Sequence, residues 1–507
     1  MKRLLFLAHR WLGIALCLLL VLWFGSGLVM MYVGYPKLTT DERLAALPPL
    51  DPQRCCAPLE ELLAAVRAGN APAPGVAGAP SSVRLTTVAG APRAALGFGK
   101  AAPVAVEAAK GGVAPVGPVD EAAALAAARA YRPDAVVVSE GAIAEDAWTH
   151  SRALDPHRPL WRVRVDDAEG TVVWVSSRTG EPVRDATATE RAWNWVGAWL
   201  HWLYVFRGGA VDRHWHDIVV WLSVAGTALV LTGTVVGWLR VRWGRRYRNG
   251  TASPYPPGVA RWHHWLGLGA GALAFTWVVS GLFSMNPWKL FDSGAPPLDE
   301  AAFYGGALEP GRFAFGPAEA LARLRAAGFT ARELELRVFD GTGLYVGFDG
   351  GGGTRVLPAT PEGAALERLP RAAVEAAAAR LLPGARAASA QWLEGFDAYW
   401  YGRAEHTMLG HVEKRLPVLR MRFADAHDTW VHVDPHTGAV AGRLDRHQRV
   451  KRWAFAFLHS WDWLPLLENR PAWDVLLVAG SLCGLALAVT GTVGAWRRLA
   501  RRGRAGA

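Results

Sequence analysis

Four long apolar stretches interrupt the polar pattern of the chain. They cover residues 11–35, 218–239, 262–288 and 475–496, and none of them contains Asp, Glu, Lys or Arg. A helix of about 20 such residues crosses the hydrocarbon core of a bilayer. The hydrophobic content of 51% and the 25 Trp residues also fit a membrane protein. We therefore predict four membrane-spanning helices.

The two long segments between these stretches show short helical and strand patterns. Ala-rich residues 120–131 and 371–382 predict helices, and residues 160–165 and 172–175 flank a polar turn and predict a β-hairpin. Residues 418–423 and 429–433 repeat the hairpin pattern. We expect each segment to form one or two small α+β modules, joined by Ala-, Pro- and Gly-rich linkers such as residues 70–80.

Basic residues beside the spans predict the topology, because Lys and Arg accumulate on the cytoplasmic side. Both termini and the short central loop should then be cytoplasmic and the two long segments outside. A signal peptide at the N-terminus is disfavoured because the apolar run is too long and no A-x-A site follows it. The net charge of +11 is explained by these flanking arginines, so we expect no nucleic-acid partner. The flanking residues are Lys2, Arg3, Arg10, Arg240, Arg242, Arg245, Arg246, Arg248, Arg497, Arg498, Arg501, Arg502 and Arg504.

The chain contains an internal duplication. His9-Arg-Trp-Leu-Gly13 matches His263-His-Trp-Leu-Gly267 at an offset of 254, and Ser26-Gly-Leu28 matches Ser280-Gly-Leu282 at the same offset. Because the first and third spans run in the same direction, the halves should be parallel repeats around an axis near the membrane normal. Further matches at an offset of 258 are Leu200-His201 with Leu458-His459, Thr232-Gly-Thr-Val235 with Thr490-Gly-Thr-Val493, Trp238 with Trp496, and Thr179-Gly180 with Thr437-Gly438.

This organisation divides the chain into eight parts. The expected boundaries are 1–35 for the first span, 36–190 for the first outer domain, 191–240 for an interfacial helix with the second span, 241–260 for a cytoplasmic basic loop, 261–288 for the third span, 289–450 for the second outer domain, 451–498 for an interfacial helix with the fourth span, and 499–507 for a cytoplasmic tail.

The duplication pairs four histidines at the membrane. His9 and His263 lie at the cytoplasmic ends of spans, and His201 and His459 lie in short apolar stretches near the outer interface. An ionisable group at such a position is costly and suggests function. Two imidazoles brought together suit a haem iron in a helix-walled pocket. Small residues nearby would allow close approach of helices or a macrocycle: Gly13, Gly25, Gly27, Gly267, Gly269 and Gly271.

Other residues leave alternatives open. Each histidine could simply be an interfacial side chain hydrogen-bonded to headgroups or backbone. His214 or His216 could replace His201 as a ligand, and His264 could replace His263. Adjacent Cys55 and Cys56 are not expected to pair with each other, and no metal-binding spacing includes the cysteines. We expect the remaining outer histidines to be surface residues, namely His406, His411, His427, His432 and His436.

The histidine motifs, the Thr-Gly endings and the turn at Val433-Asp-Pro-His-Thr-Gly438 together resemble the PepSY-associated transmembrane family, over nearly the whole chain. The resemblance implies a four-span membrane α-helical fold of duplicated units with two extracytoplasmic α+β PepSY-like domains. It also implies similarity to bacterial inner-membrane siderophore reductases with two b-type haems. His9 and His263 match the inner histidines of that family and His201 and His459 the outer ones. The family likeness leaves the pairing of these ligands open.

The expected activity is that of a haem-dependent oxidoreductase. Electrons from a quinol or a cytoplasmic reductant would reduce a ferric siderophore, or another iron chelate, outside the inner membrane and release Fe(II). The first rival is a membrane-anchored binding or regulatory protein of the PepSY type without redox activity. The second is a transporter, which four spans without an intramembrane carboxylate or a broken helix pair disfavour. The sequence leaves the catalytic residues, the electron donor and the oligomeric state undefined.

Overall fold

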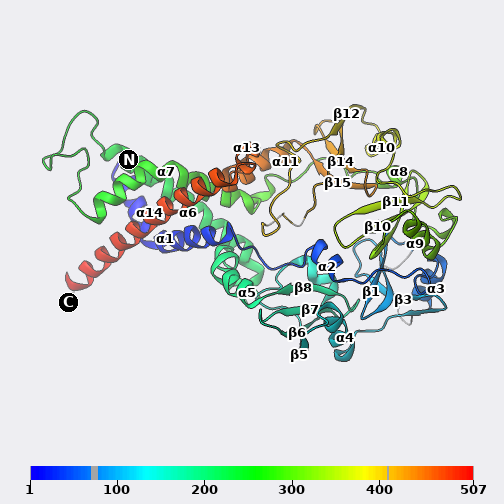
Figure 1. The fold of residues 1–507 in the computed structure, drawn as a ribbon. Coiled ribbons are helices and arrows are strands. Elements are labelled where there is room, and N and C mark those ends of the chain that lie inside the picture. The colour runs from blue at the N-terminus through cyan, green and yellow to red at the C-terminus, as the bar shows by residue number, and fades with distance from the viewer. Residues whose placement is uncertain (1, 70–77, 408–409, 411, 506–507) are drawn as a thin grey trace.

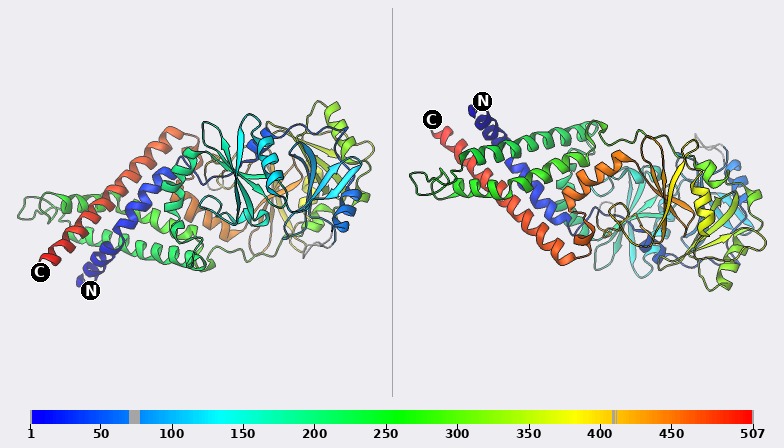
Figure 2. Two further views of the ribbon diagram at one scale, coloured as in Figure 1. Left: turned by 90° about the horizontal axis from the view of Figure 1, so that it is seen from below. Right: turned by 90° about the horizontal axis from the view of Figure 1, so that it is seen from above.

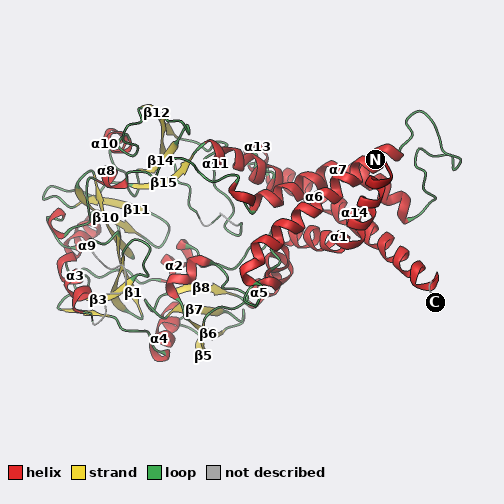
Figure 3. Ribbon diagram, turned by 180° about the vertical axis from the view of Figure 1, so that it is seen from behind, coloured by secondary structure: helices red, strands yellow, loops and turns green. Residues whose placement is uncertain are grey.

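The computed structural model describes residues 2–69, 78–407, 410 and 412–505. A bundle of long helices forms one end of the molecule, and a larger part with three β-sheets forms the other (Figures 1 and 3). Both termini lie at the free end of the bundle (Figure 1).

Four helices in the described part are long and apolar enough to cross a membrane, as the sequence predicted. Each of these helices packs against two of the others. α1 contacts α6 and α14, and α7 contacts the same two helices, so α1 and α7 face each other across the bundle. The four are α1 (Lys2–Met30), α6 (Trp215–Arg240), α7 (Val259–Ser284) and α14 (Arg470–Ala505).

Apolar side chains from all four helices fill the middle of the bundle. Phe24 and Trp277 meet there, with ring centroids 6.0 Å apart. On the outside of the bundle, large apolar side chains such as Leu18 and Trp221 are exposed, as expected for a surface that faces lipid. The core residues include Leu16, Leu20, Leu229, Val230, Ala274, Val278, Leu477 and Ala488.

A seven-stranded antiparallel sheet joins the two halves of the outer part. Its strand order is β11-β10-β9-β1-β2-β3-β4, and β1 from the first half pairs with β9 from the second. One face of this sheet is apolar and is covered by α3 (Leu59–Ala68) and α9 (Pro317–Ala326). The strands are β1 (Ser82–Val88), β2 (Ala91–Gly97), β3 (Val104–Ala109), β4 (Gly112–Pro115), β9 (Glu333–Phe339), β10 (Thr342–Phe348) and β11 (Thr354–Pro358).

Two four-stranded antiparallel sheets flank the central one (Figures 1 and 3). Helix α4 (Glu121–Tyr131) packs on the first and α10 (Arg371–Ala378) on the second. These helices and the hairpins β6–β7 and β13–β14 confirm the sequence patterns. The first sheet consists of β5 (Val136–Ile143), β6 (Leu160–Asp166), β7 (Val172–Ser176) and β8 (Pro182–Ala186), and the second of β12 (Ala387–Leu393), β13 (Val418–Phe423), β14 (Trp430–Asp434) and β15 (Ala439–Leu444).

Two connecting helices lead from these sheets to the bundle. α5 (Ala188–Asn194) and α11 (Arg446–Lys451) each begin with a capping box, in which Thr187 or Asp445 caps the first turn. Each continues through a π-helical segment, Trp195–Trp199 or Arg452–Phe457. The remaining short helices are α2 (Thr40–Ala46), α8 (Glu300–Tyr304), α12 (Leu458–Ser460) and α13 (Leu464–Leu467), with 3₁₀ turns at Arg152–His157, Tyr204–Phe206, Asp212–His214, Pro287–Lys289 and Pro310–Arg312.

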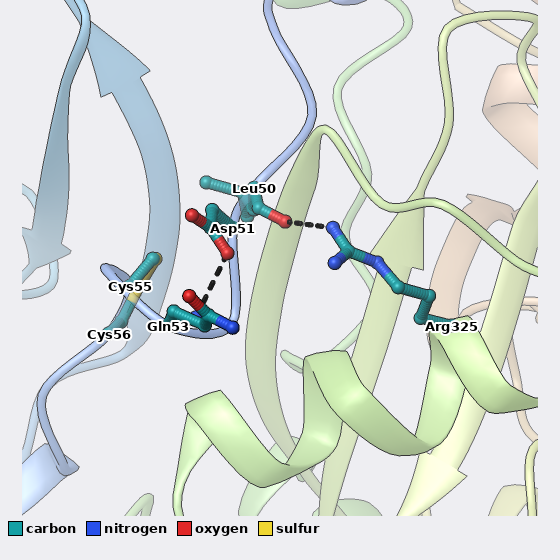
Figure 4. Close-up of a disulfide and its surroundings, with 6 residues drawn as sticks. All are labelled: Leu50, Asp51, Gln53, Cys55, Cys56 and Arg325. Atoms are coloured by element: carbon teal, nitrogen blue, oxygen red, sulfur yellow. Dashed lines mark hydrogen bonds between the residues drawn. A yellow bond between two sulfur atoms is a disulfide. The ribbon is translucent and has the colours of Figure 1, made fainter.

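Cys55 and Cys56 form a disulfide (Figure 4), so the expectation that they would stay unpaired was wrong. Both side chains are buried in the core beneath the central sheet, and Cys55 forms a backbone bridge with Ala109 of β3. The preceding turn is tied to the second half of the chain, because Arg325 of α9 donates to the Leu50 carbonyl at 3.4 Å.

Candidate functional site

His9 and His263 meet at the end of the bundle where the termini lie. His9 is in the second turn of α1 and His263 in the second turn of α7. Their ring centroids are 6.3 Å apart, and the ring planes differ by 28°. The two helices that face each other across the bundle therefore each contribute one imidazole to this inner pair.

His201 and His459 meet near the other end of the bundle. Their ring centroids are 6.1 Å apart with an interplanar angle of 66°. His201 follows the π-helical segment after α5 and lies against α1, whereas His459 lies in α12 against α7. The structure thus brings together the four histidines singled out from the sequence, in the pairing His9–His263 and His201–His459.

All four imidazoles have an acceptor next to Nδ1. The Nδ1 atom of His9 lies 3.3 Å from the Leu229 carbonyl, and that of His263 lies 3.2 Å from the Leu487 carbonyl. In the outer pair the neighbours are serine hydroxyls, Ser26 at 3.1 Å from His201 and Ser280 at 3.0 Å from His459.

These neighbours determine which ring nitrogen carries the proton. A carbonyl can only accept, and both serine hydroxyls already donate to backbone carbonyls, Ser26 to Leu22 at 2.6 Å and Ser280 to Trp277 at 3.0 Å. Each imidazole therefore donates from Nδ1 and keeps a lone pair on Nε2. Among the described residues, none of the four Nε2 atoms has a hydrogen-bond partner. In metal-binding histidines, a hydrogen bond from the other ring nitrogen orients the ligating nitrogen in this way.

A glycine lies against each imidazole. A Cβ atom built on Gly27 would lie 3.3 Å from Cε1 of His201, and one on Gly233 would lie 2.6 Å from Cε1 of His9. The corresponding distances are 3.6 Å for Gly281 with His459 and 3.2 Å for Gly491 with His263. An added Cβ would therefore crowd the ring at Gly27, Gly233 and Gly491, whereas at Gly281 it would make an ordinary van der Waals contact.

The sequence prediction identified only Gly27 among these four glycines. Of the other predicted glycines, Gly271 allows close approach of Thr234, whereas a Cβ on Gly25 or Gly269 would meet nothing within 4 Å. Gly233, Gly281 and Gly491 lie in the repeated Thr-Gly and Ser-Gly-Leu motifs, and this repetition was the signal by which they could have been found.

The two histidine pairs lie at opposite ends of the bundle. His9 and Ser26, the neighbour of His201, are 17 residues apart on one helix, which corresponds to about 26 Å at the usual helical rise. Phe24 and Trp277, together with aliphatic side chains, fill the space between the pairs. The apolar stretches of the four helices, residues 11–35, 218–239, 262–288 and 475–496, contain no Asp, Glu, Lys or Arg.

The alternative ligands have different surroundings. Both nitrogens of His264 are hydrogen-bonded, to the Ser253 hydroxyl at 2.8 Å and the Gly237 carbonyl at 3.0 Å, and the side chain is buried between helices. His216 is exposed, and its Nε2 donates to the Met285 carbonyl at 3.0 Å. His214 is exposed and accepts a hydrogen bond from Arg213 at 2.9 Å.

One outer histidine does not lie on the surface. His432 is 1% exposed, stacks on Trp400 with centroids 4.6 Å apart, and accepts a hydrogen bond from Arg420 at 2.8 Å. Burial and the neighbouring guanidinium lower the pKa of His432 to about 3, so it is neutral. The expectation of a surface residue was wrong here, because Trp400 and Arg420 cover the imidazole ring. His411 lies outside the described residues.

The donor set is suited to a haem. Within the described residues, no three His, Cys, Asp or Glu side chains lie close enough to form a metal site by themselves. Two imidazoles supply too few ligands for a bare ion, but they complete the coordination of an iron that a porphyrin already holds. The ring centroids are 6.3 Å apart in the inner pair and 6.1 Å apart in the outer pair, close enough for two imidazoles to bind one metal at about 2 Å each.

A charged cavity of about 360 Å³ lies apart from these histidines, none of which lines it. It opens on the polar face of the central sheet, where Arg84 contacts Glu181 at 2.7 Å and Glu333 at 2.8 Å. Although burial opposes ionisation, the Arg84 guanidinium lowers the pKa of Glu181 to about 2. These ion pairs join β1, β9 and the turn before β8.

A scan against protein-family models and a search of curated proteins found no match for the chain.

Proposed function

We propose that this protein is a membrane haem protein that carries electrons across a bilayer to an iron chelate. The proposal rests on the two histidine pairs: the Nε2 atoms have no hydrogen-bond partner among the described residues, and the two rings of each pair lie close enough to share one iron. One pair at each end of the bundle provides a redox site near each membrane surface.

The residues of the chain fit this group in three ways. The lone pairs on Nε2 lack partners among the described residues, the Nδ1 atoms are fixed by serine or backbone oxygens, and glycines leave room for the rings. A bound haem at each pair would supply one-electron chemistry of iron, with a potential set by its axial ligands and its burial. The protein itself positions the imidazoles and keeps charged groups out of the layer between the pairs.

Each site takes one histidine from each half of the chain. This arrangement supports the proposed duplication into parallel repeats, as do the two flanking sheets of equal strand number and order. We further propose that these sheets belong to PepSY-like modules, in keeping with the resemblance of the sequence to the PepSY-associated transmembrane family.

The proposed orientation places both termini in the cytoplasm of a bacterial cell and the sheets outside the inner membrane, because basic residues flank the spans at the end with the termini. The proposed acceptor is a ferric siderophore or a similar chelate. Hard oxygen donors hold Fe(III) more tightly than Fe(II), so delivery of one electron weakens the complex and releases the metal.

The test is a reduced-minus-oxidised optical spectrum of the purified full chain with haem quantified per chain. We expect two b-type haems. His9→Ala and His263→Ala should each lose the inner haem, and the double variant should lose no more than either single one. His201→Ala and His459→Ala should do the same for the outer haem, whereas His9→Ala with His201→Ala should lose both.

His264→Ala and His216→Ala are the matched controls, because both nitrogens of each ring are already engaged or exposed. They should retain two haems. Absence of haem after expression with an adequate haem supply would overturn the proposal and favour a regulatory membrane anchor. Loss of both haems from every single variant would contradict the pairing.

A further inference from the structure

The end of the bundle that carries the termini is strongly basic. The segments 1–35, 218–288 and 475–507 contain fourteen Lys and Arg residues and no Asp or Glu. The whole chain has 55 basic and 44 acidic residues, so the remainder has 41 basic residues against all 44 acidic ones. The positive charge of the protein therefore comes entirely from this one face, and the sheets at the other end are slightly acidic.

Two structural elements, a loop and the end of a helix, place part of this charge beyond the apolar stretches. The loop from Val241 to Gly258 is folded by its own hydrogen bonds, among them Arg242 N to the Ala252 carbonyl at 3.0 Å and Tyr247 N to the Thr251 carbonyl at 2.9 Å. Arg245, Arg246 and Arg248 are exposed on it. All views show this loop extending beyond the ends of the helices (Figures 1 and 2).

Helix α14 forms the second projection. Its apolar stretch, residues 475–496, already matches the thickness of a hydrocarbon core of about 30 Å. The helix nevertheless continues to Ala505, with Arg497, Arg498 and Arg501 exposed. A few basic residues next to each span are enough to fix the orientation of the protein in the membrane. A folded loop and a helical extension present more charge than that, on a preformed surface beyond the membrane.

The inner histidine pair lies directly at this face. His9 and His263 are both within the first two turns of their helices, and Arg10 and Arg261 flank them in sequence. A protein that docks on the basic surface would therefore bring a redox centre close to the inner site. Electrostatic steering to such a surface can raise association rates about 10–10³-fold at low salt.

We propose that this basic face docks an acidic one-electron carrier protein of the ferredoxin or flavodoxin class, which is the electron donor of the protein. The inference rests on the proposed function, since it names the reductant of the inner site. With a haem held by His9 and His263, each encounter would oxidise the carrier by one electron and reduce the haem iron by one, with no bond formed and no proton exchanged. The docking itself requires only the charged surface.

The test measures binding first and electron transfer second. The full chain in nanodiscs of phosphatidylcholine, which has no net charge, is titrated with an oxidised acidic [2Fe–2S] ferredoxin and with cytochrome c, a basic carrier. We expect binding of the ferredoxin alone, weakening more than tenfold as the Debye length falls from about 30 Å at 0.01 M salt to about 8 Å at 0.15 M. The variant R245E/R246E/R248E should weaken it at least tenfold at low salt.

The control variant R129E/R178E/R368E makes the same change of charge on exposed residues of the sheet-bearing part, and should bind like the wild type. In stopped-flow experiments, reduced ferredoxin should reduce the wild type and the control variant faster than the loop variant, whereas dithionite should reduce all of them at the same rate. Equal ferredoxin binding by wild type and the loop variant would overturn the proposal. The proposal would also fail if the loop variant lost co-purifying anionic lipid and showed no other change. A chain that binds ferredoxin but contains no haem would contradict the proposed function alone.

Discussion

At the scale of single residues, the orientation of each imidazole depends on the hydrogen-bond partner of its Nδ1 atom. Ser280 accepts a hydrogen bond from Nδ1 of His459 and donates one to the Trp277 carbonyl, so it fixes both the tautomer and the ring orientation. Ser26 holds His201 in the same way. A ligand without such a partner loses its preference for presenting Nε2.

We predict that Ser280→Ala weakens retention of the proposed outer haem by about 10–100-fold, the usual effect of removing the hydrogen-bond partner of a metal-binding histidine. The measurement is transfer of haem to excess apomyoglobin, followed optically. Ser284→Ala is the matched control, because Ser284 lies one turn further along α7 and donates only to the Gly281 carbonyl. Equal transfer rates in the two variants would contradict the role given to Ser280, and Ser280→Thr should restore the wild-type rate.

A second residue-scale prediction concerns acid stability. The pKa of Glu181 is lowered to about 2 because the attraction of Arg84 outweighs the cost of burial. Its stabilising effect is complete above the ordinary glutamate pKa of 4.5 and is lost as the pH falls from there through the folded-state pKa. Relative to Glu181→Gln, the wild type should be more stable by about 3 kcal/mol at pH 7 and by about half of that at pH 3.

Urea unfolding of the full chain in detergent, followed at both pH values, measures this difference. Other carboxylates also titrate in this range, but they are common to both proteins and cancel in the comparison. A stability difference that does not change between pH 7 and pH 3 would show that the carboxylate of Glu181 has an ordinary pKa.

At the scale of elements, local patterns were sufficient for part of the fold only. The apolar stretches, the Ala-rich helices and two hairpins could be predicted because each depends on residues close together in the chain. The seven-stranded sheet could not, since the pairing of β1 with β9 joins residues about 250 positions apart, for example Arg84 with Glu335. Likewise, the four histidines follow from the duplication, but their Nδ1 partners and glycine neighbours belong to helices that only the folded bundle brings next to them.

The connecting helix α5 links the first flanking sheet to the outer site, and its capping box supports a testable prediction. Thr187→Ala removes the side chain that accepts from the Glu190 amide, which should destabilise the helix by about 1 kcal/mol. Hydrogen exchange at residues 188–201 should become faster, and the outer haem should be retained less well than the inner one. Ser151→Ala is the control, because Ser151 precedes a 3₁₀ turn without a side-chain cap. Unchanged exchange in α5 would contradict a stabilising role for the cap.

At the scale of the whole molecule, the two halves of the chain are interleaved. The bundle contacts α1–α14 and α6–α7 both cross between halves, and so does the pairing of β1 with β9. The ion pair of Arg84 with Glu333 adds a buried link on the polar face of the central sheet. The same interleaving places both histidine pairs on the boundary between the halves.

The final prediction follows from the composition of the sites. Each histidine pair takes one member from residues 1–250 and one from residues 251–507. A cut after Gly250, in the exposed loop between α6 and α7, separates these halves without touching a helix or strand. Co-expressed halves should therefore associate and bind two haems per pair of fragments, whereas either half expressed alone should bind neither haem with two histidine ligands.

The measurements are co-purification through a tag on one fragment, and the low-temperature electron paramagnetic resonance spectrum of the oxidised haem, which distinguishes ligation by two imidazoles from ligation by one. His9→Ala in the first fragment should remove only the inner haem from the reassembled protein, because His201 is still present. If one fragment alone gave a haem with two histidine ligands, the sites would have to lie within a half, and the pairing across the bundle would be wrong.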